Sequence, residues 1–139
     1  MKGLSESRRQ EFLAGTHVAV LSVAATGGRP PASAPIWYEY SPGGDIRIST
    51  TVASRKSKLI KQAGAVTLVV QNEQPPYQYV VVEGTVVDTT TPTPLEMQEA
   101  TAIRYLGEEA ARAFIASMAY TESVMFTIRP DRWISADFS

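Results

Sequence analysis

A run of hydroxyl side chains followed by two adjacent cations carries the clearest chemical signal in the sequence. Hydroxyl residues occupy positions 49–51 at the end of a predicted strand, and Ser54 then precedes Arg55 and Lys56 at a predicted helix start. The free N–H groups of a first helical turn are already positive, so each uncompensated cation there costs roughly 0.3–1 kcal/mol. A phosphate would remove that cost and accept hydrogen bonds from these groups. The segment therefore predicts a phosphate site, with a solvated basic face as the alternative.

The charge distribution favours one local anionic ligand over a long polyanion. The 139 residues include 13 basic and 14 acidic side chains, which give a net charge of −1. Five of the basic residues fall between Arg47 and Lys61, where no acidic residue intervenes. A nucleic-acid track would need many dispersed phosphate contacts. We therefore expect no nucleic-acid partner, and single-strand binding by a small aromatic barrel is the weaker alternative class of function.

Few side chains could perform chemistry on their own. The sequence contains no cysteine and a single histidine, His17, and it lacks both the Gly-x-Ser-x-Gly and the Gly-x-Gly-x-x-Gly patterns. These absences exclude thiolate nucleophiles and disulfides, and they argue against a serine-hydrolase elbow or a dinucleotide fingerprint. We expect no metal site. Any redox chemistry would have to come from a bound cofactor.

Aromatic residues on predicted strands form a second candidate feature. Alternation along a strand places Trp37 on one face and both Tyr38 and Tyr40 on the other. Such residues could be barrel core and dimer contact, or they could form a flat apolar slot for a fused aromatic ring. The full set is Trp37, Tyr38, Tyr40, Tyr77, Tyr79 and Trp133.

Short strands and a few helices must position these side chains. Thr93 and Glu96 form a capping signal, and residues 129–131 are typical of a turn. Gly84 indicates a bulge or a barrel corner, and Pro35 indicates a strand edge, a bulge or a ligand-facing position. Seven strands at this spacing favour a mainly β fold, a small antiparallel barrel with helices against it. The patterns predict helices over 5–14, 54–62, 93–106 and 108–119, and strands over 16–24, 32–40, 46–51, 65–71, 78–90, 123–128 and 133–138.

Length and hydropathy bound the class of protein. A chain of 139 residues that is 44% hydrophobic is typical of one globular domain, which we place over 1–139. No apolar run approaches the ~18 residues that a membrane span needs. Positions 1–15 carry charges and no apolar signal-peptide core. We therefore expect a cytoplasmic protein without a membrane partner.

The order of these features resembles the pyridoxamine 5'-phosphate oxidase-like split β-barrel superfamily. The resemblance extends from about Phe12 to Trp133. Within the superfamily, the chain looks most like the small actinobacterial flavin- or deazaflavin-dependent oxidoreductases. The resemblance rests on the turn Gly27-Gly28-Arg29-Pro30, the strand segment Pro35-Ile36-Trp37-Tyr38 and the pattern Thr50-x-x-x-Ser54-Arg55-Lys56.

The resemblance implies a homodimer of split barrels with cofactor sites at the interface. The family's Arg-Lys pair, which maps onto Arg55 and Lys56, holds the cofactor phosphate. Residues 49–51 would contact phosphate or ring, 33–36 would lie along the ring edge, and the partner chain would contribute the start of the strand at 78. The implied cofactor-binding residues are Ser33, Ala34, Pro35, Ile36, Ser49, Thr50, Thr51, Ser54, Arg55, Lys56, Tyr77 and Tyr79. Trp133 and residues 80–82 are further candidates for the dimer contact.

Two departures from the oxidases argue against oxidation of pyridoxamine phosphate. Ser33 stands where the oxidases carry a phosphate-binding arginine, and the segment 129–133 lacks their Arg-x-His element. The deazaflavin branch of the superfamily accepts small residues on the strand at 32–40, which favours coenzyme F420, a deazaflavin, over FMN. The resemblance thus implies an F420-dependent oxidoreductase that transfers a hydride to a small organic substrate, with solvent or a tyrosine such as Tyr38 or Tyr79 as proton source. The alternatives are an FMN-binding reductase or oxidase and a non-catalytic cofactor-binding protein.

Overall fold

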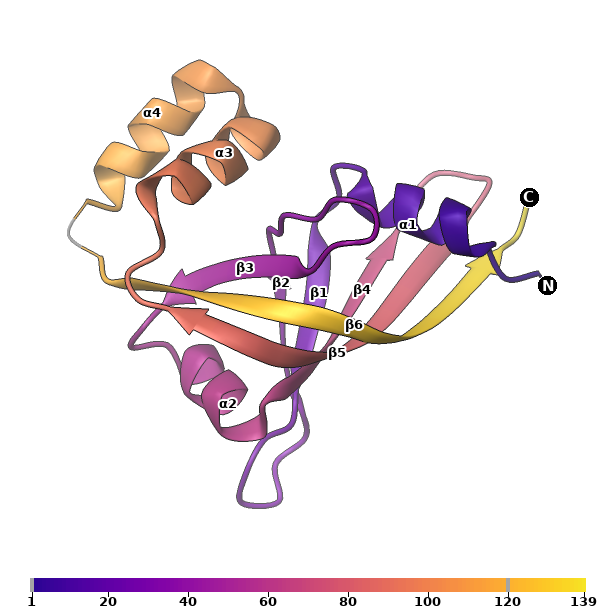
Figure 1. Ribbon diagram of the computed structural model, residues 1–139, viewed down its shortest axis with the longest axis horizontal. Coiled ribbons are helices and arrows are strands. Elements are labelled where there is room, and N and C mark those ends of the chain that lie inside the picture. The colour runs from indigo at the N-terminus through magenta and orange to yellow at the C-terminus, as the bar shows by residue number, and fades with distance from the viewer. Residues whose placement is uncertain (1, 120) are drawn as a thin grey trace.

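The computed structural model describes residues 2–119 and 121–139, and within them six strands form one antiparallel sheet in the order β2-β1-β4-β5-β6-β3 (Figure 1). Neighbouring strands all run in opposite directions. The elements in chain order are α1 (Glu6–Ala14), β1 (Ala19–Val23), β2 (Ala32–Ile36), β3 (Ile46–Thr51), α2 (Arg55–Ala63), β4 (Ala65–Gln71), β5 (Gln78–Thr90), α3 (Leu95–Leu106), α4 (Glu108–Ser117) and β6 (Ser123–Asp137).

Alternation of side chains along the strands explains how the core forms. In β4, Val66, Leu68 and Val70 are buried, and the residues between them are more exposed. This period of two is what a sheet with one covered face requires. Two helices cover the buried face, α1 through Leu13 and α2 through Ile60, and both side chains are fully buried.

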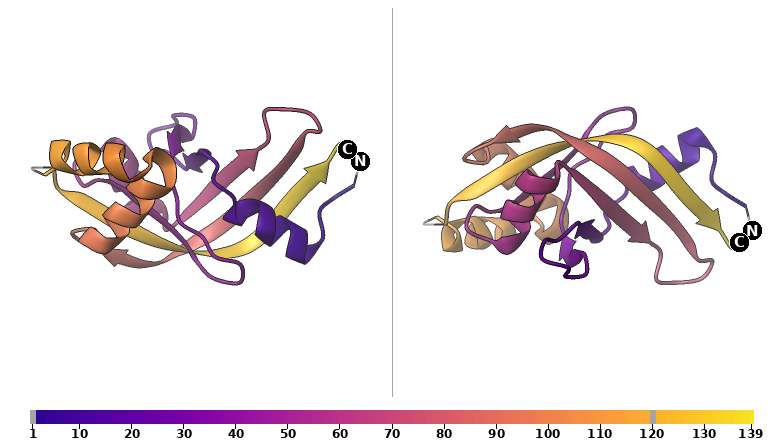
Figure 2. Two further views of the ribbon diagram at one scale, coloured as in Figure 1. Left: turned by 90° about the horizontal axis from the view of Figure 1, so that it is seen from above. Right: turned by 90° about the horizontal axis from the view of Figure 1, so that it is seen from below.

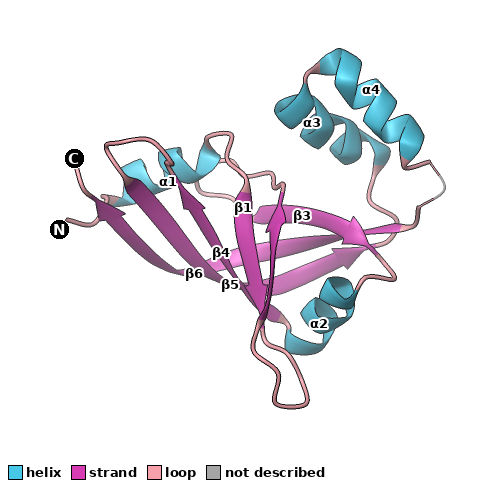
Figure 3. Cartoon of the chain, turned by 180° about the vertical axis from the view of Figure 1, so that it is seen from behind, coloured by secondary structure: helices cyan, strands magenta, loops and turns pink. Residues whose placement is uncertain are grey.

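The sheet curls until its two edge strands approach each other. Glu39, shortly after β2, exchanges both backbone hydrogen bonds with Arg47 of β3, each with an N–O distance of 2.9 Å. This bridge joins the two ends of the sheet, and the described strands and helices form a half-barrel of the split-barrel kind (Figures 2 and 3). Pro35 lies in β2, which pairs only with β1, so the edge position predicted for this proline is confirmed.

β6 is continuous where the sequence predicted a turn at 129–131 between two strands. That prediction of seven strands is wrong, because the register with β5 shifts beside Gly84, which pairs with Pro130, and Asp131 becomes the extra residue of a bulge. The proline is tolerated because the β3 pairing ends at Ile128, which leaves one side of β6 open beyond it. A Cβ atom at Gly84 would lie 2.5 Å from Cγ2 of Ile128, which explains the glycine.

Two of the predicted strands are shorter than expected. β1 begins at Ala19 rather than residue 16, because His17 folds back and its Nε2 donates to the carbonyl oxygen of Phe12 at 3.0 Å. β2 ends at Ile36 rather than residue 40, because the chain beyond it turns toward β3 and meets Arg47 through Glu39.

α3 begins later than its capping signal predicts. Pro94 occupies the N-cap position, and the hydroxyl of Thr93 donates to Oγ of Ser49 at 3.2 Å instead of capping the helix. The backbone N–H of Thr93 donates to Oγ of Ser123 at 3.3 Å. These tertiary hydrogen bonds replace the local cap and connect the start of α3 to β3 and β6. α3 and α4 form a hairpin on the opposite side of β3 from α2 (Figures 1 and 3).

In the described residues, no helix is both long enough and apolar enough to cross a membrane.

Candidate cofactor-binding site

The start of α2 has the features that an anion site requires. Ser54 is the N-cap, as predicted: its Oγ accepts the N–H of Ser57 at 3.1 Å and donates to the carbonyl oxygen of Thr51 at 2.8 Å. The backbone N–H groups of Arg55 and Lys56 donate to no acceptor within the described chain. Two free N–H groups therefore begin a helix with no acidic residue in its first turn.

The cations of α2 lack anionic partners inside the chain. Among described residues, no carboxylate oxygen lies within 4.0 Å of the charged nitrogens of Arg55, Lys56, Lys58 or Lys61. Lys56 is half-buried, and burial lowers the pKa of its ammonium group. A bound phosphate would offset that desolvation and accept from the free N–H groups, so these residues fit a phosphate-bearing cofactor.

A pocket of about 260 Å³ lies between the end of β3, the start of β6 and the α3–α4 hairpin. None of its lining residues carries a charge, and its wall combines hydroxyl groups with aromatic and aliphatic side chains. Such a neutral, partly apolar pocket suits a ring rather than an ionic group. The lining residues are Trp37, Ser49, Thr50, Thr51, Gln98, Thr101, Ala102, Phe114, Ile115, Met118, Thr121 and Ser123.

The hydroxyl run joins this pocket to the start of α2. Thr50 and Thr51 line the pocket, and Oγ1 of Thr50 lies 3.5 Å from Oγ of Ser54. Thr51 also accepts the hydrogen bond from Ser54 through its carbonyl oxygen. Thr50 thus touches both the pocket and the capping residue of α2, whereas Ser54, Arg55 and Lys56 do not line the pocket.

Residues 33–36 are placed differently. The hydroxyl of Ser33 lies 2.9 Å from that of Ser22 on the outer face of the sheet, and Pro35 is exposed on the same face. The side chain of Ile36 is buried in the core, which leaves only its backbone for a ligand. The residue of this region that reaches the pocket is Trp37, which follows β2 directly.

Tyr77 and Tyr79 lie at the far end of the sheet. Tyr79 pairs with Ala136 of β6, whereas Thr51 pairs with Ser123, 13 residues away on the same strand. At about 3.3 Å per residue, that is roughly 40 Å of strand. The structure therefore does not bring these tyrosines to the pocket of their own chain.

Tyr38 is not available as a proton donor to a ligand. Its side chain is fully buried, and its hydroxyl donates to the carbonyl oxygen of Leu13 at 2.6 Å. Burial raises the pKa of this phenol well above its usual value. Of the aromatic set considered from the sequence, Trp37 alone lines the pocket in the described chain.

Sequence reasoning missed the wall that α3 and α4 supply. Phe114, Ile115 and Met118 are apolar at helical spacing, a pattern that indicates a helix facing something apolar. It gives no indication of which surface the helix faces, because that depends on where the hairpin packs.

The curled half-barrel, with short helices packed against it, is the fold of a split-barrel protein. A family profile described as pyridoxamine 5'-phosphate oxidase matches residues 6–136. The chain belongs to this family. None of the curated proteins matches the sequence.

Several solved structures share the fold at low sequence identity. An F420 reductase is similar with a TM-score of 0.73 and 22% identity, over 90% of this chain and 94% of that one. A conserved hypothetical protein from Mycobacterium tuberculosis is similar with a TM-score of 0.73 and 19% identity, over 97% and 86%. An FAD-binding protein from Mesorhizobium loti is similar with a TM-score of 0.66 and 18% identity, over 99% and 98%.

Proposed function

We propose that this protein is an oxidoreductase that binds coenzyme F420 and reduces a small organic substrate. The observation that carries the proposal is the position of Thr50, which lines the neutral pocket and lies 3.5 Å from Ser54, the cap that precedes the two free N–H groups of α2. A reduced deazaflavin supplies a hydride. The chain binds the phosphate at Arg55 and Lys56, orients the ring with the hydroxyl run, and excludes water with the α3–α4 wall.

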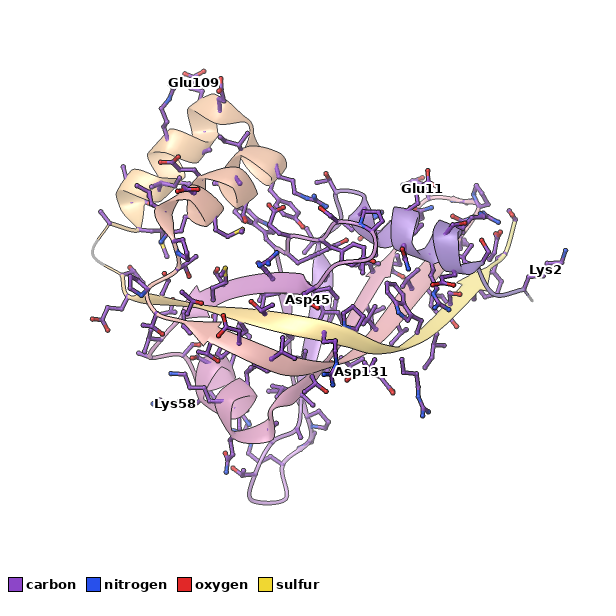
Figure 4. All side chains as sticks on the ribbon, in the orientation of Figure 1. Lys2, Glu11, Asp45, Lys58, Glu109 and Asp131 are labelled. Carbon is purple, nitrogen blue, oxygen red and sulfur yellow. The ribbon has the colours of Figure 1, made fainter. Side chains whose placement is uncertain are left out.

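The choice of F420 over FMN rests on the cations beyond the first turn of α2. Lys58 and Lys61 are exposed, and Lys58 extends away from the sheet (Figure 4). They offer contacts to the carboxylates of an F420 tail, which FMN lacks. The similar F420 reductase supports the same choice, and the similar FAD-binding protein supports the flavin alternative. An FMN-dependent enzyme or a cofactor carrier without turnover remains the competing function.

We also propose a homodimer, with a second copy on the outer face of the sheet. Apolar side chains there lie directly opposite one another across five strands, and Val20 and Ile134 are 42% and 47% exposed. A second copy would cover this row and could bring its Tyr77 and Tyr79 to the cofactor. The row consists of Pro35, Val20, Val69, Val81 and Ile134.

The dimer contact expected from the sequence is wrong for two of its four residues, whereas Trp133 is only partly buried. Val80 and Val82 are fully buried in the chain's own core, so they cannot meet a partner. Trp133 packs against Tyr40 and lies beneath the guanidinium of Arg9. Val81, which points outward between the two buried valines, keeps its place in the proposed interface.

The test is retention of cofactor followed by turnover. The protein is mixed with F420 or FMN, desalted, and the retained cofactor is read from its absorbance. Retention of F420, with oxidation of its reduced form by an enone or quinone, is the expected result. Retention of FMN alone favours the flavin enzyme, and F420 retention without turnover favours the carrier. Sedimentation as a monomer at micromolar concentration contradicts the dimer.

A further inference from the structure

The indole of Trp37 is held between aromatic rings from two helices. It stacks on Tyr105 of α3 with ring centroids 4.9 Å apart and planes inclined by 5°. It also contacts Phe114 of α4, with centroids 5.3 Å apart and planes at 46°. Aromatic pairs of this kind stabilise a particular ring orientation beyond simple area burial. Trp37 and Phe114 line the pocket, whereas Tyr105 does not.

Tyr105 is itself fixed by the backbone of two other segments. Its hydroxyl donates to the carbonyl oxygen of His17 at 2.6 Å and accepts the N–H of Tyr38 at 3.2 Å. The Tyr38 amide belongs to the peptide bond that follows Trp37, so Tyr105 holds both the ring and the backbone at this position. Burial raises the pKa of Tyr105, and its hydroxyl therefore stays protonated and able to donate.

The preceding residue anchors the same helix end. The Arg104 guanidinium donates to the carbonyl oxygens of Ala14 and Gly15 at 3.0 and 2.7 Å. The last turn of α3 is thus bonded to the end of α1 and to the residue that follows it. This attachment gives Tyr105 a fixed position from which to orient Trp37.

We propose that Tyr105 is a positioning residue for the pocket, which sets the orientation of Trp37 and thereby the affinity for a flat ring without touching the ligand. The inference rests on the proposed function, in which the cofactor ring enters this pocket. Because the lining residues carry no charge, affinity for the ring depends on the shape and preorganisation of the wall.

The test uses Trp37 as its own reporter. The chain has two tryptophans, so a Trp133→Phe background leaves Trp37 alone. In that background, Tyr105→Leu removes the stack and the hydroxyl bonds, whereas Tyr105→Phe keeps the ring and removes only the hydroxyl bonds. Without ligand, both variants should weaken the near-ultraviolet circular dichroism of Trp37 and increase its quenching by acrylamide, more strongly for leucine.

Binding of FMN and F420 is then measured for the same proteins. We expect Tyr105→Leu to weaken both ligands about three- to tenfold, from the loss of one aromatic pair that orders the wall. Tyr105→Phe should recover part of that loss, because the stacked ring remains. Leu106→Ala, on the same helical turn and outside the pocket lining, should leave both affinities unchanged.

The outcomes separate the two proposals. If both Tyr105 variants leave the Trp37 signal as it was, or change the signal while ring affinity is unaltered, the positioning role is wrong. If the parent protein binds neither cofactor, the proposed function fails, and the ligand-free Trp37 signal alone decides whether Tyr105 orients the wall. If Tyr105→Leu does not fold, as judged by far-ultraviolet circular dichroism, the signal and affinities of the phenylalanine variant decide between these outcomes.

Discussion

The two walls of the pocket are built in different ways. The β3 wall is held by backbone pairing with β6 from Ile46 to Thr51, and its inner residues belong to the core. The α3–α4 wall has only Ala102 and Ala111 fully buried among its described residues, and Phe114 is 40% exposed. Side chains in the core-forming wall contribute mainly to the free energy of unfolding. Side chains in the partly exposed wall contribute mainly to the affinity for a ligand. Substitutions in the two walls should therefore affect different properties.

The largest expected effect compares two phenylalanines. Phe126 of β6 is fully buried opposite Ile48 of β3, whereas Phe114 is partly exposed on α4. Phe126→Ala should lower the free energy of unfolding by about 3–5 kcal/mol, through lost burial and a cavity. Phe114→Ala should lower it by roughly 1 kcal/mol or less. Urea denaturation of both variants measures the difference, and similar losses at the two sites would contradict the distinction between the walls.

Arg55→Ala should weaken cofactor binding without unfolding the chain. A hydrogen bond to a charged group contributes about 1.5–3 kcal/mol, so affinity should fall roughly 10- to 150-fold. The melting temperature without ligand should stay the same or rise slightly, because a cation leaves a positive helix end. Isothermal titration with F420 and FMN measures the affinity.

Arg29→Ala is the matched control for the arginine substitution. Arg29 is exposed in the turn between β1 and β2, outside both the pocket and α2, and its loss should not alter binding. An unchanged dissociation constant for Arg55→Ala with both cofactors would remove the phosphate site from α2.

The sequence predicts the β3 wall well, because its signals are local. The hydroxyl run and the Ser54 cap lie within six residues of sequence, and they remain close together in the structure. The α3–α4 wall depends on contacts across the chain, such as Thr93 to Ser49 and Tyr105 to His17. Local capping rules cannot predict these long-range hydrogen bonds. The capping rules therefore place the start of α3 too early. The bulge indicated by Gly84 is confirmed, but its position opposite Asp131 could not be predicted, because the segment around Pro130 is typical of a turn when its partner strand is unknown.

A smaller effect should distinguish the tails of the two cofactors. Lys58 and Lys61 are solvent-exposed, so each contact to a tail carboxylate is worth roughly 0–1 kcal/mol and is screened by salt. The double variant Lys58→Ala with Lys61→Ala should weaken F420 more than FMN. The preference of the parent protein for F420 should shrink as salt rises to physiological levels. Equal losses for both ligands, or a preference that ignores salt, favour the FMN alternative.

The smallest expected effect concerns His17, in the segment that anchors the α3–α4 wall. Burial lowers the pKa of His17, the bond to the Phe12 carbonyl opposes this, and the nearby Arg104 charge lowers it further. The unfolded chain protonates this imidazole near pH 6.5. Between that pH and the lower pKa of the folded state, the unfolded chain binds more protons, so the free energy of unfolding decreases as pH falls. Melting temperatures between pH 8 and 5 should show this decrease, and His17→Gln should reduce it.

Titration of His17 also tests whether the segment between α1 and β1 orders the pocket wall around Trp37. A protonated His17 repels the charge of Arg104, which donates to Ala14 and Gly15. His17 also supplies the carbonyl oxygen to which Tyr105 donates. If the α3–α4 wall depends on this segment, the Trp37 quenching of the Trp133→Phe protein should rise over the pH range in which stability falls. A loss of stability with constant Trp37 quenching would confine the effect to the packing of α1, because His17 also stacks on Phe12 of that helix. The wall would then be held by the ring contacts of Tyr105 and Phe114 with Trp37, independently of the bonds to the segment that contains His17.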